Sequence, residues 1–258
     1  MEWLDYKQYF REIDDSFLMS IFKDSPYPWS PILKLESAID EYFNELNDTG
    51  SLAGKRVILR DETDQFIEGS YFINESQILQ KDFIDQELKI YIGSGTLVEA
   101  GATIKNHTII RNNCEIRQSA YLRGFAFVGE HSVIGHTTEI KNSIFIKHVE
   151  AGHFAYIGDS IIGANVNLGA GTKLSNLQFR TLAAKKTDKF PIIQFKHNNK
   201  NFDTKLSKFG AIIGDGCETG CNSVLCPFVF LEPECWIMPN FCVVKGVYRR
   251  GKLFWNKK

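Results

Sequence analysis

Three absences in this sequence of 258 residues exclude whole classes of protein. No stretch approaches the roughly 18 consecutive apolar residues that a membrane-spanning helix needs. The N-terminus, MEWLDYKQYF, has no basic segment ahead of an apolar one, so we expect no signal peptide. A net charge of −1 offers no basic excess for a dedicated nucleic-acid-binding protein. We therefore expect a cytoplasmic protein that has no membrane span and does not bind nucleic acids.

The six cysteines include no CxxC pair, which argues against a zinc site. In the cytosol we expect them to be reduced thiols.

A period of six residues organises the middle of the chain. Ten aliphatic residues recur at this spacing: Ile92, Val98, Ile104, Ile110, Ile116, Leu122, Val128, Ile134, Ile140 and Ile146. The residue four positions after each of the first eight is small. The frame is lost near Lys147–Gly152 and returns with Ile162, Leu168 and Leu174. A fixed internal period is the mark of a repeat architecture.

This period predicts a β-solenoid, because each hexapeptide supplies one short strand and one corner. The aliphatic residue should point inward and stack on its equivalents in neighbouring coils. The small residue should fill the tighter inward position near the bend, which makes core fillers of Cys114, Cys217 and Cys235. Glycines that follow the aliphatic residues, such as Gly129 and Gly135, should give the corners backbone freedom.

The flanking segments do not follow the period. Residues 1–90 predict a small α+β domain that caps an open end of the solenoid, with helices near Leu4–Phe22 and from Ser30-Pro31. Strands are expected at Arg56–Arg60, Phe66–Ile73 and Leu88–Ile92. The solenoid itself should span residues 91–245, interrupted by a protruding hairpin loop at 177–207. A tail at 246–258 completes the prediction.

The repeat resembles that of the hexapeptide-repeat superfamily, which implies a mainly β chain folded as a left-handed parallel β-helix. One stretch narrows the resemblance: AGHFAYIGD at Ala151–Asp159, followed by NVNLGAGT at Asn165–Thr172. It is similar to the acetyltransferase half of the bifunctional glucosamine-1-phosphate acetyltransferase/N-acetylglucosamine-1-phosphate uridyltransferase. The similarity extends over roughly residues 92–240 of this sequence.

The resemblance implies a role for each matching residue. His153 matches the general base, which takes a proton from the attacking amine. Arg123, Lys141 and Lys208 match cations that hold the phosphate of the substrate.

Other matches complete the implied site. Tyr156 matches a contact to the sugar phosphate, and Asn167 matches a residue that holds the sugar. The remaining matches lie along the groove for acetyl-CoA, the implied co-substrate: Ala170, Asn176, Cys221 and Asn222.

The implied function is acetyl transfer from acetyl-CoA to an amino-sugar 1-phosphate, glucosamine 1-phosphate first and galactosamine 1-phosphate second. Such a reaction serves the synthesis of UDP-N-acetylglucosamine and cell-envelope precursors, needs no metal, and takes place in a homotrimer. The sequence has no glycine-rich nucleotide loop, and 90 residues before the repeat are too few for a uridyltransferase domain. We therefore expect a stand-alone acetyltransferase. Glu150 and Ser207 depart from the family pattern, because basic residues are common at both places.

Two alternatives remain open. The chain could be a non-catalytic trimeric scaffold, which the lost charges at Glu150 and Ser207 favour. It could also be a metalloenzyme like the γ-class carbonic anhydrases, because His131 and His136 have the five-residue spacing of two ligands there. However, His107 lies 24 residues before His131 and does not fall on the same face. A full ligand set is therefore missing.

Overall fold

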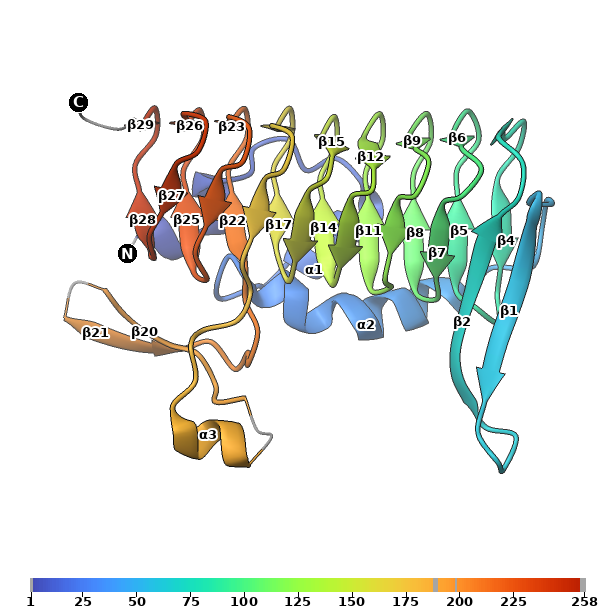
Figure 1. The fold of residues 1–258 in the computed structure, drawn as a ribbon, viewed down its shortest axis with the longest axis horizontal. Coiled ribbons are helices and arrows are strands. Elements are labelled where there is room, and N and C mark those ends of the chain that lie inside the picture. The colour runs from blue at the N-terminus through green and yellow to red at the C-terminus, as the bar shows by residue number, and fades with distance from the viewer. Residues whose placement is uncertain (1, 188–189, 198, 256–258) are drawn as a thin grey trace.

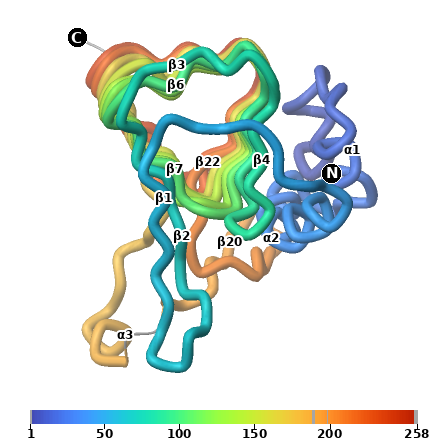
Figure 2. Tube along the Cα trace, turned by 90° about the vertical axis from the view of Figure 1, so that its right-hand side faces the viewer, coloured from blue at the N-terminus to red at the C-terminus, as the bar shows by residue number. Residues whose placement is uncertain are grey.

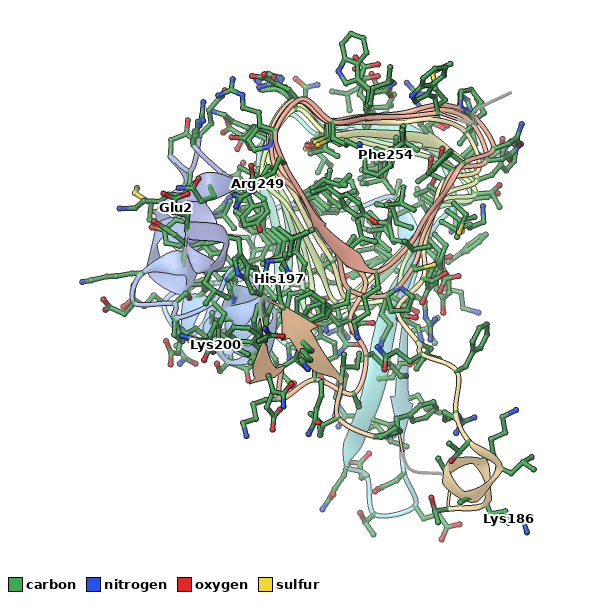
Figure 3. All side chains as sticks on the ribbon, turned by 90° about the vertical axis from the view of Figure 1, so that its left-hand side faces the viewer. Glu2, Lys186, His197, Lys200, Arg249 and Phe254 are labelled. Carbon is green, nitrogen blue, oxygen red and sulfur yellow. The ribbon has the colours of Figure 1, made fainter. Side chains whose placement is uncertain are left out.

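The structure, a computed structural model, describes residues 2–187, 190–197 and 199–255. It has the predicted architecture, a mainly β chain wound into a left-handed parallel β-helix (Figure 1). Three sheets form the sides of a triangular prism, and Figure 3 shows this outline along the helix axis. No helix in the described part of the chain is long and apolar enough to cross a membrane.

Each sheet collects one strand from every coil, with nine strands per sheet among the described residues. In spatial order, sheet A contains β4 (Phe83–Asp85), β5 (Ile90–Ile92), β8 (Thr108–Ile110), β11 (Ala126–Val128), β14 (Ser143–Phe145), β17 (Ile161–Ile162), β22 (Ala211–Ile213), β25 (Val229–Leu231) and β28 (Gly246–Tyr248). Sheet B contains β1 (Gly54–Arg60), β2 (Phe66–Ile73), β7 (Thr103–Lys105), β10 (Tyr121–Leu122), β13 (Glu139–Lys141), β16 (Tyr156–Gly158), β19 (Lys173–Leu174), β24 (Val224–Leu225) and β27 (Cys242–Val243). Sheet C contains β3 (Gln77–Ile78), β6 (Leu97–Val98), β9 (Glu115–Ile116), β12 (Val133–His136), β15 (Glu150–His153), β18 (Asn167–Leu168), β23 (Glu218–Thr219), β26 (Trp236–Ile237) and β29 (Leu253–Phe254).

The inward residues stack as predicted, but the repeat changes frame earlier than predicted. The pairs Tyr121↔Glu139 and Ala126↔Ser143 are 18 and 17 residues apart, so one residue is lost between Ile140 and Phe145. Phe145, not Ile146, takes the inward position, and Ile146 packs against the N-terminal helices instead. The predicted break near Lys147–Gly152 was therefore placed too late.

The backbone conformation at the corners gives the same frame of the repeat. A residue with positive φ marks each corner, and within one stretch these are His107, Asn113, Ser119, Phe125, His131, Thr137, Asn142, His148, Phe154, Asp159 and Asn165. The spacing is six residues except for two steps of five, from Thr137 to Asn142 and from Phe154 to Asp159. The prediction that glycine gives the corners their freedom was wrong for Gly129 and Gly135. A Cβ on either would lie 1.7 Å from a carbonyl oxygen of the next coil, so close approach between coils requires glycine there.

The N-terminal helices lie along one side of the prism, while the strands that follow them cover its first coil. The helical elements are η1 (Glu2–Leu4), η2 (Tyr6–Gln8), α1 (Ser16–Phe22) and α2 (Ser30–Phe43). Helices α1 and α2 lie against sheet A in Figure 2. At the first coil, β1 and β2 extend sheet B, β3 extends sheet C and β4 extends sheet A, all in antiparallel pairing. The helix predicted near Leu4–Phe22 is correct only for α1, because the chain before Ser16 forms short 3-10 turns.

Two hydrophobic cores result from this arrangement. One fills the interior of the prism, and the other lies between the helices and the outer side of sheet A. The second core uses the central residue of successive sheet A strands: Tyr91, Ile109, Phe127, Ile144, Ile161, Ile212 and Phe230. Burial of these side chains at about 25 cal/mol per Å² of apolar surface explains why the helices lie along this side.

The chain leaves the prism after β19 and returns at β22. This excursion contains α3 (Leu182–Lys186) and the antiparallel pair β20 (Gln194–His197) and β21 (Lys200–Asp203). In Figures 1 and 2 it projects on the same side of the prism as the β1–β2 hairpin, at the opposite end. The coils then continue through β28 and β29, and Phe254 points into the interior in Figure 3. A tail beginning at residue 246 was therefore predicted too early.

Candidate active site

Three of the predicted cations gather on the outer side of sheet B. Leu122 and Ile140 point inward as partners in adjacent strands, so the residues that follow them, Arg123 and Lys141, point outward on neighbouring coils. Lys208 approaches from the chain that returns to the prism, and its positive charge acts on Lys141. Sequence and topology therefore concentrate positive charge on one side of two coils.

Arg123 and Lys141 each have an acidic neighbour. Arg123 donates from Nη1 to Oε1 of Glu139 at 2.7 Å, and this bond raises the pKa of Arg123. The Nζ of Lys141 lies 3.8 Å from Oδ1 of Asp159. Burial lowers the pKa of Lys141, the Asp159 charge opposes this, and the charges of Lys208 and Arg123 lower it further. A second anion near Lys141 would therefore stabilise its charged form.

Asp159 is a buried acidic residue that contacts this cluster. It is only 3% exposed and occupies a corner with φ of +51°. Its carboxylate accepts hydrogen bonds from Nδ2 of Asn142 at 2.8 Å and from Nδ2 of Asn176. Asp159 was not among the predicted site residues, although its position directly after Gly158 in the AGHFAYIGD motif was a usable signal.

Tyr156 lies across the same surface. Its hydroxyl and Nδ2 of Asn176 would each lie 2.7 Å from a Cβ placed on Gly158, so glycine leaves the space that both side chains use. Burial raises the pKa of Tyr156, and the nearby Asp159 and Glu139 charges raise it further. The hydroxyl is therefore a neutral hydrogen-bond donor at neutral pH.

His153 lies around the corner from Tyr156. It is the last residue of β15 in sheet C and is exposed, and Phe154 forms the corner with φ of +53°. The ring of His136, its partner in the previous coil, stacks on it with centroids 5.7 Å apart. The lost repeat frame near Lys147–Gly152 predicts that a frame change places His153 at a corner. The strand end and the Phe154 turn achieve this placement, and the frame changes lie on either side of it.

Three predicted cofactor residues share the His153 corner. The amide of Gly171 donates to the His153 carbonyl at 2.9 Å, which brings Ala170 beside His153 in the next coil. The amide of Asn222 donates to the Ala170 carbonyl at 2.8 Å, and Cys221 precedes it. Ala170, Cys221 and Asn222 therefore continue the row that begins with His153. The side chains of Cys221 and Asn222 are exposed.

Asn167 is set apart from both clusters. It lies on β18 in sheet C, directly beside Glu150 of β15, and both are exposed. The predicted residues thus form a sheet B group (Arg123, Lys141, Tyr156, Asn176 and Lys208) and a corner group (His153, Ala170, Cys221 and Asn222). No hydrogen bond or ion pair between side chains of the described residues joins these two groups.

Four of the six histidines form two separate pairs, so the two ligands of the metalloenzyme alternative, His131 and His136, belong to different pairs. His131 stacks on His148 at another corner, with ring centroids 4.8 Å apart, while His136 stacks on His153. Within residues 2–187, 190–197 and 199–255, no group of three or more His, Cys, Asp or Glu side chains could hold a metal ion.

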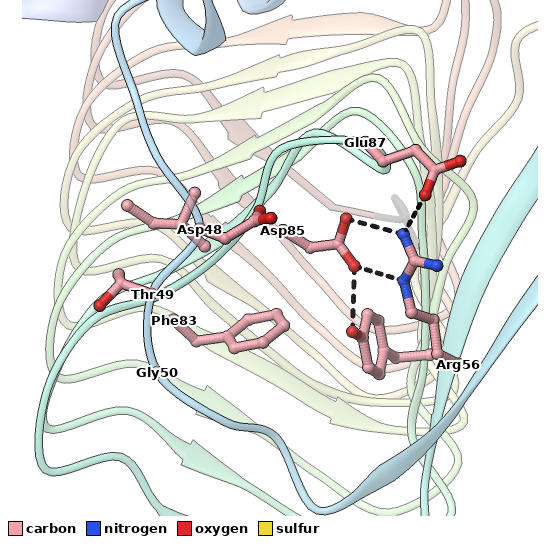
Figure 4. Close-up of a pocket in the computed structure, with 9 residues that line it drawn as sticks. Asp48, Thr49, Gly50, Arg56, Phe83, Asp85 and Glu87 are labelled. Atoms are coloured by element: carbon pink, nitrogen blue, oxygen red, sulfur yellow. Dashed lines mark hydrogen bonds and ion pairs between the residues drawn. The ribbon is translucent and has the colours of Figure 1, made fainter.

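Two cavities differ sharply in character. One of about 490 Å³ at the first coil contains Arg56, Asp85 and Glu87, whose charges are paired with one another as Figure 4 shows. The other, of about 470 Å³, lies on sheet B beyond Asn176 and is lined by Ser175, Leu177, Gln178, Phe179, Val224, Cys226, Pro227 and Lys245. We call the second cavity the apolar groove.

Comparison with known proteins places similarity over the same part of the chain. The family described as "GMPPB C-terminal domain" matches residues 104–196. "Bifunctional protein GlmU" of Methanococcus aeolicus is 35% identical over 123 residues, 47% of this chain and 27% of that protein. The protein of the same name from Methanocaldococcus jannaschii is 31% identical over 127 residues, 47% of this chain and 29% of that protein.

A third relative carries a fuller description. The "bifunctional sugar-1-phosphate nucleotidylyltransferase/acetyltransferase" of Sulfurisphaera tokodaii is 32% identical over 111 residues, 43% of this chain and 25% of that protein. The match thus spans about a quarter of the length of each of these three relatives. Together with the six-residue repeat and the parallel β-solenoid, these similarities confirm the resemblance of this chain to the hexapeptide-repeat acyltransferases.

Proposed function

We propose that this protein transfers an acetyl group from acetyl-CoA to the amine of an amino-sugar 1-phosphate, with glucosamine 1-phosphate as the first candidate and galactosamine 1-phosphate as the second. One observation supports the proposal above others. Three cations cluster on sheet B, and the exposed His153 lies one corner away from them. A small molecule with an anionic group at one end and an amine at the other suits this arrangement.

The three cations of the sheet B group form the proposed phosphate site, while Asn176 stays assigned to acetyl-CoA. Arg123 offers a planar set of donors that matches phosphate oxygens, and Lys141 and Lys208 add two point charges. Asp159 and Glu139 hold two of these cations before substrate binds. The neutral hydroxyl of Tyr156 supplies a directional hydrogen bond to the sugar or its phosphate.

His153 is the proposed general base. An amine attacks an acyl carbon only through its lone pair, so a proton must leave nitrogen as the new bond forms. The exposed imidazole of His153 accepts this proton and can return it to the departing sulfur. The ring is held by His136 on one side, and its backbone carbonyl is bonded to Gly171.

The corner group and the apolar groove fit acetyl-CoA. Bound there, acetyl-CoA supplies an acyl carbon activated by its bond to sulfur. Ala170 next to His153 leaves room for a small group, and Gly152 is open to solvent with only Arg117 at 3.9 Å from its Cβ position. The apolar groove of about 470 Å³ has a volume within the range of ligand sites and can hold the flexible arm.

A homotrimer is part of the proposal. Closed symmetry is the common form of homo-oligomers, and the sheet B and corner groups both lie on the outside of the prism, where a neighbouring protomer could enclose them. The absence of uridyltransferase activity and the cytoplasmic location expected from the sequence also belong to the proposal.

One observation favours the alternative of a non-catalytic scaffold. Arg123 is hydrogen-bonded to Glu139, and Glu150 lies beside Asn167. Each of these two proposed substrate-binding residues, Arg123 and Asn167, therefore has an acidic side chain next to it. Calorimetry with acetyl-CoA separates the two functions, because a scaffold with a decayed site should not bind it.

The transferase is tested by release of free thiol from acetyl-CoA in the presence of each amino-sugar 1-phosphate at neutral pH. Turnover with glucosamine 1-phosphate, and none with unmodified glucose 1-phosphate, is the expected result. Absence of turnover with every amino-sugar phosphate would overturn the proposal.

A further inference from the structure

Lys173 makes an unusual contact at the corner that carries His153. Its Nζ donates to the carbonyl oxygen of Phe154 at 2.7 Å and to that of Gly171 at 2.8 Å. These two residues form the same corner in successive coils, and both have positive φ, +53° and +77°. One ammonium group thus bridges two consecutive corners.

The two carbonyl groups have no other partner in the backbone. Within the described residues, no backbone amide donates to the oxygen of Phe154 or of Gly171. At this corner neither carbonyl takes part in the ladder of hydrogen bonds between coils, so water would otherwise satisfy them. An ammonium group with three donors can satisfy both and keep one donor free.

This contact is specific to one coil. Lys173 begins β19 and pairs with Tyr156 of the previous coil. The equivalent residues in the other coils are Thr103, Tyr121, Glu139, Tyr156, Val224 and Cys242, and none is basic. The lysine therefore does not serve the solenoid in general, because the other coils form their corners without it.

The braced corner, like those at Phe125 and Phe228, places an aromatic residue at positive φ. Phe154 is an aromatic residue in the left-handed region, a conformation that is unfavourable for residues with a side chain and persists only where its surroundings enforce it. Two backbone bonds help: the Phe154 amide donates to His136, and the Gly171 amide donates to His153. Lys173 supplies the remaining restraint, on the carbonyl side of Phe154.

We propose that Lys173 is a positioning residue, which fixes the His153–Phe154 corner and so sets the direction of the His153 imidazole. The effect of Lys173 on catalysis rests on the proposed function. Its effect on the geometry of the corner does not depend on any activity. Burial lowers the pKa of Lys173, in keeping with an ammonium group that is drawn partly out of water toward the two carbonyls.

Two substitutions isolate the contact. Lys173→Met keeps the apolar stem and removes all donors, whereas Lys173→Arg keeps a charged donor that can reach the same oxygens. Lys147→Met is the matched control, because Lys147 pairs with Asp14 at another corner at 2.7 Å. Hydrogen exchange is followed at the amides of Phe154 and Gly171, and kinetics are measured with acetyl-CoA and glucosamine 1-phosphate.

In Lys173→Met, exchange at these two amides should be at least about tenfold faster, because local opening controls the rate. The kcat should fall about 10- to 100-fold with both KM values within about threefold, since a misplaced reacting group costs rate rather than affinity. Lys173→Arg should recover most of the protection and rate. Lys147→Met should resemble the wild type in both measurements.

Unchanged exchange at both amides in Lys173→Met would overturn the inference, whatever the kinetics. A wild-type protein without transferase activity would refute the proposed function instead, and the exchange measurement would still decide the role of Lys173. If Lys173→Met does not fold, Lys173→Gln is measured in its place. Failure of both to fold would show that the lysine supports the whole solenoid rather than this corner, which also overturns the inference.

Discussion

His153 and Tyr156 lie on two different sides of the β-helix, with the corner residue Phe154 between them. His153 ends a strand of sheet C, and Tyr156 begins a strand of sheet B. A spacing of three residues in a solenoid therefore joins two adjacent surfaces. We infer that the substrate lies over this corner, with its phosphate on sheet B and its amine toward His153.

Arg123 should act on substrate affinity rather than on the chemical step. The phosphate does not react, so Arg123→Ala should raise KM for the sugar phosphate and change kcat little. Glu139→Gln should do the opposite, because it removes the carboxylate that holds Arg123 at 2.7 Å. We expect a lower KM in Glu139→Gln at similar kcat. Steady-state kinetics check both, and an increased KM in Glu139→Gln would show that Glu139 orients Arg123 rather than competing with substrate.

Affinity for the sugar phosphate should fall at alkaline pH earlier than an ordinary lysine would allow. Burial lowers the pKa of Lys141, and the nearby cations Lys208 and Arg123 add to this shift, so the ammonium loses its proton at a lower pH than usual. KM should rise as the pH approaches that pKa, because the neutral amine no longer attracts phosphate. In Lys141→Arg the guanidinium stays charged, and this rise should disappear. A KM that rises equally in the wild type and in Lys141→Arg would contradict the assignment of Lys141.

The same shift has a consequence for stability. A lysine whose pKa is lower in the folded protein than in the unfolded chain destabilises the fold while it is protonated. The full cost is present below the folded pKa, and it is relieved as pH rises from the folded pKa of Lys141 to the higher pKa of the unfolded chain.

The N-terminal helices should depend on one ion pair. Arg111 is 8% exposed, and its Nε donates to Asp15 at 2.8 Å, while Asp15 also caps α1 through the amide of Leu18. Asp15→Ala removes the cap and leaves Arg111 without its carboxylate, so we expect a loss of about 3 kcal/mol in the free energy of unfolding. Asp15→Asn keeps a capping oxygen and should lose less. Urea denaturation measures both, and equal losses would show that the cap contributes nothing.

The repeat made the fold predictable from sequence, because stacking of equivalent residues is what a solenoid requires. The frame change at Ile140–Phe145 was missed because Ile144, Phe145 and Ile146 are all apolar. Any of the three could occupy the inward position by composition. The structure assigns Phe145 to the interior and the other two to the helix-packed core.

The position of the N-terminal helices could have been predicted. The residue just before the inward aliphatic is itself apolar in one strand of every coil, as in Tyr91, Ile109 and Phe127, which are 18 residues apart. A sheet that is apolar on both sides must be covered. This signal lies at a period of 18 rather than six, so a search at the shorter period does not separate it.

The candidate site was only partly accessible to sequence reasoning. The resemblance supplied residues, but not their partners. The roles of Glu139 and Lys173, and the contact of Asp159 with Lys141, became visible only through the pairing of adjacent coils, which brings together residues 17 or 18 positions apart. Around the loop the interval grows to 51 residues, as between Ile161 and Ile212, and the length of the loop alone does not reveal that pairing.

The proposed homotrimer is open to direct measurement. Light scattering across micromolar concentrations should give about three times the mass of one 29.4 kDa chain. A monomer over this range would contradict the assembly and would weaken the argument that a neighbouring protomer encloses the two groups of site residues.

The central claim is that His153 removes the proton from the amine of an amino-sugar 1-phosphate. The most direct measurement compares thiol release from acetyl-CoA by the wild type, His153→Ala and His131→Ala. His131 is the matched control, because it is also an exposed corner histidine stacked on a second histidine. We expect a loss of roughly 10²- to 10⁴-fold in kcat for His153→Ala, and activity close to that of the wild type for His131→Ala, with both variants folded. Full activity in His153→Ala would refute the role of His153 as the general base.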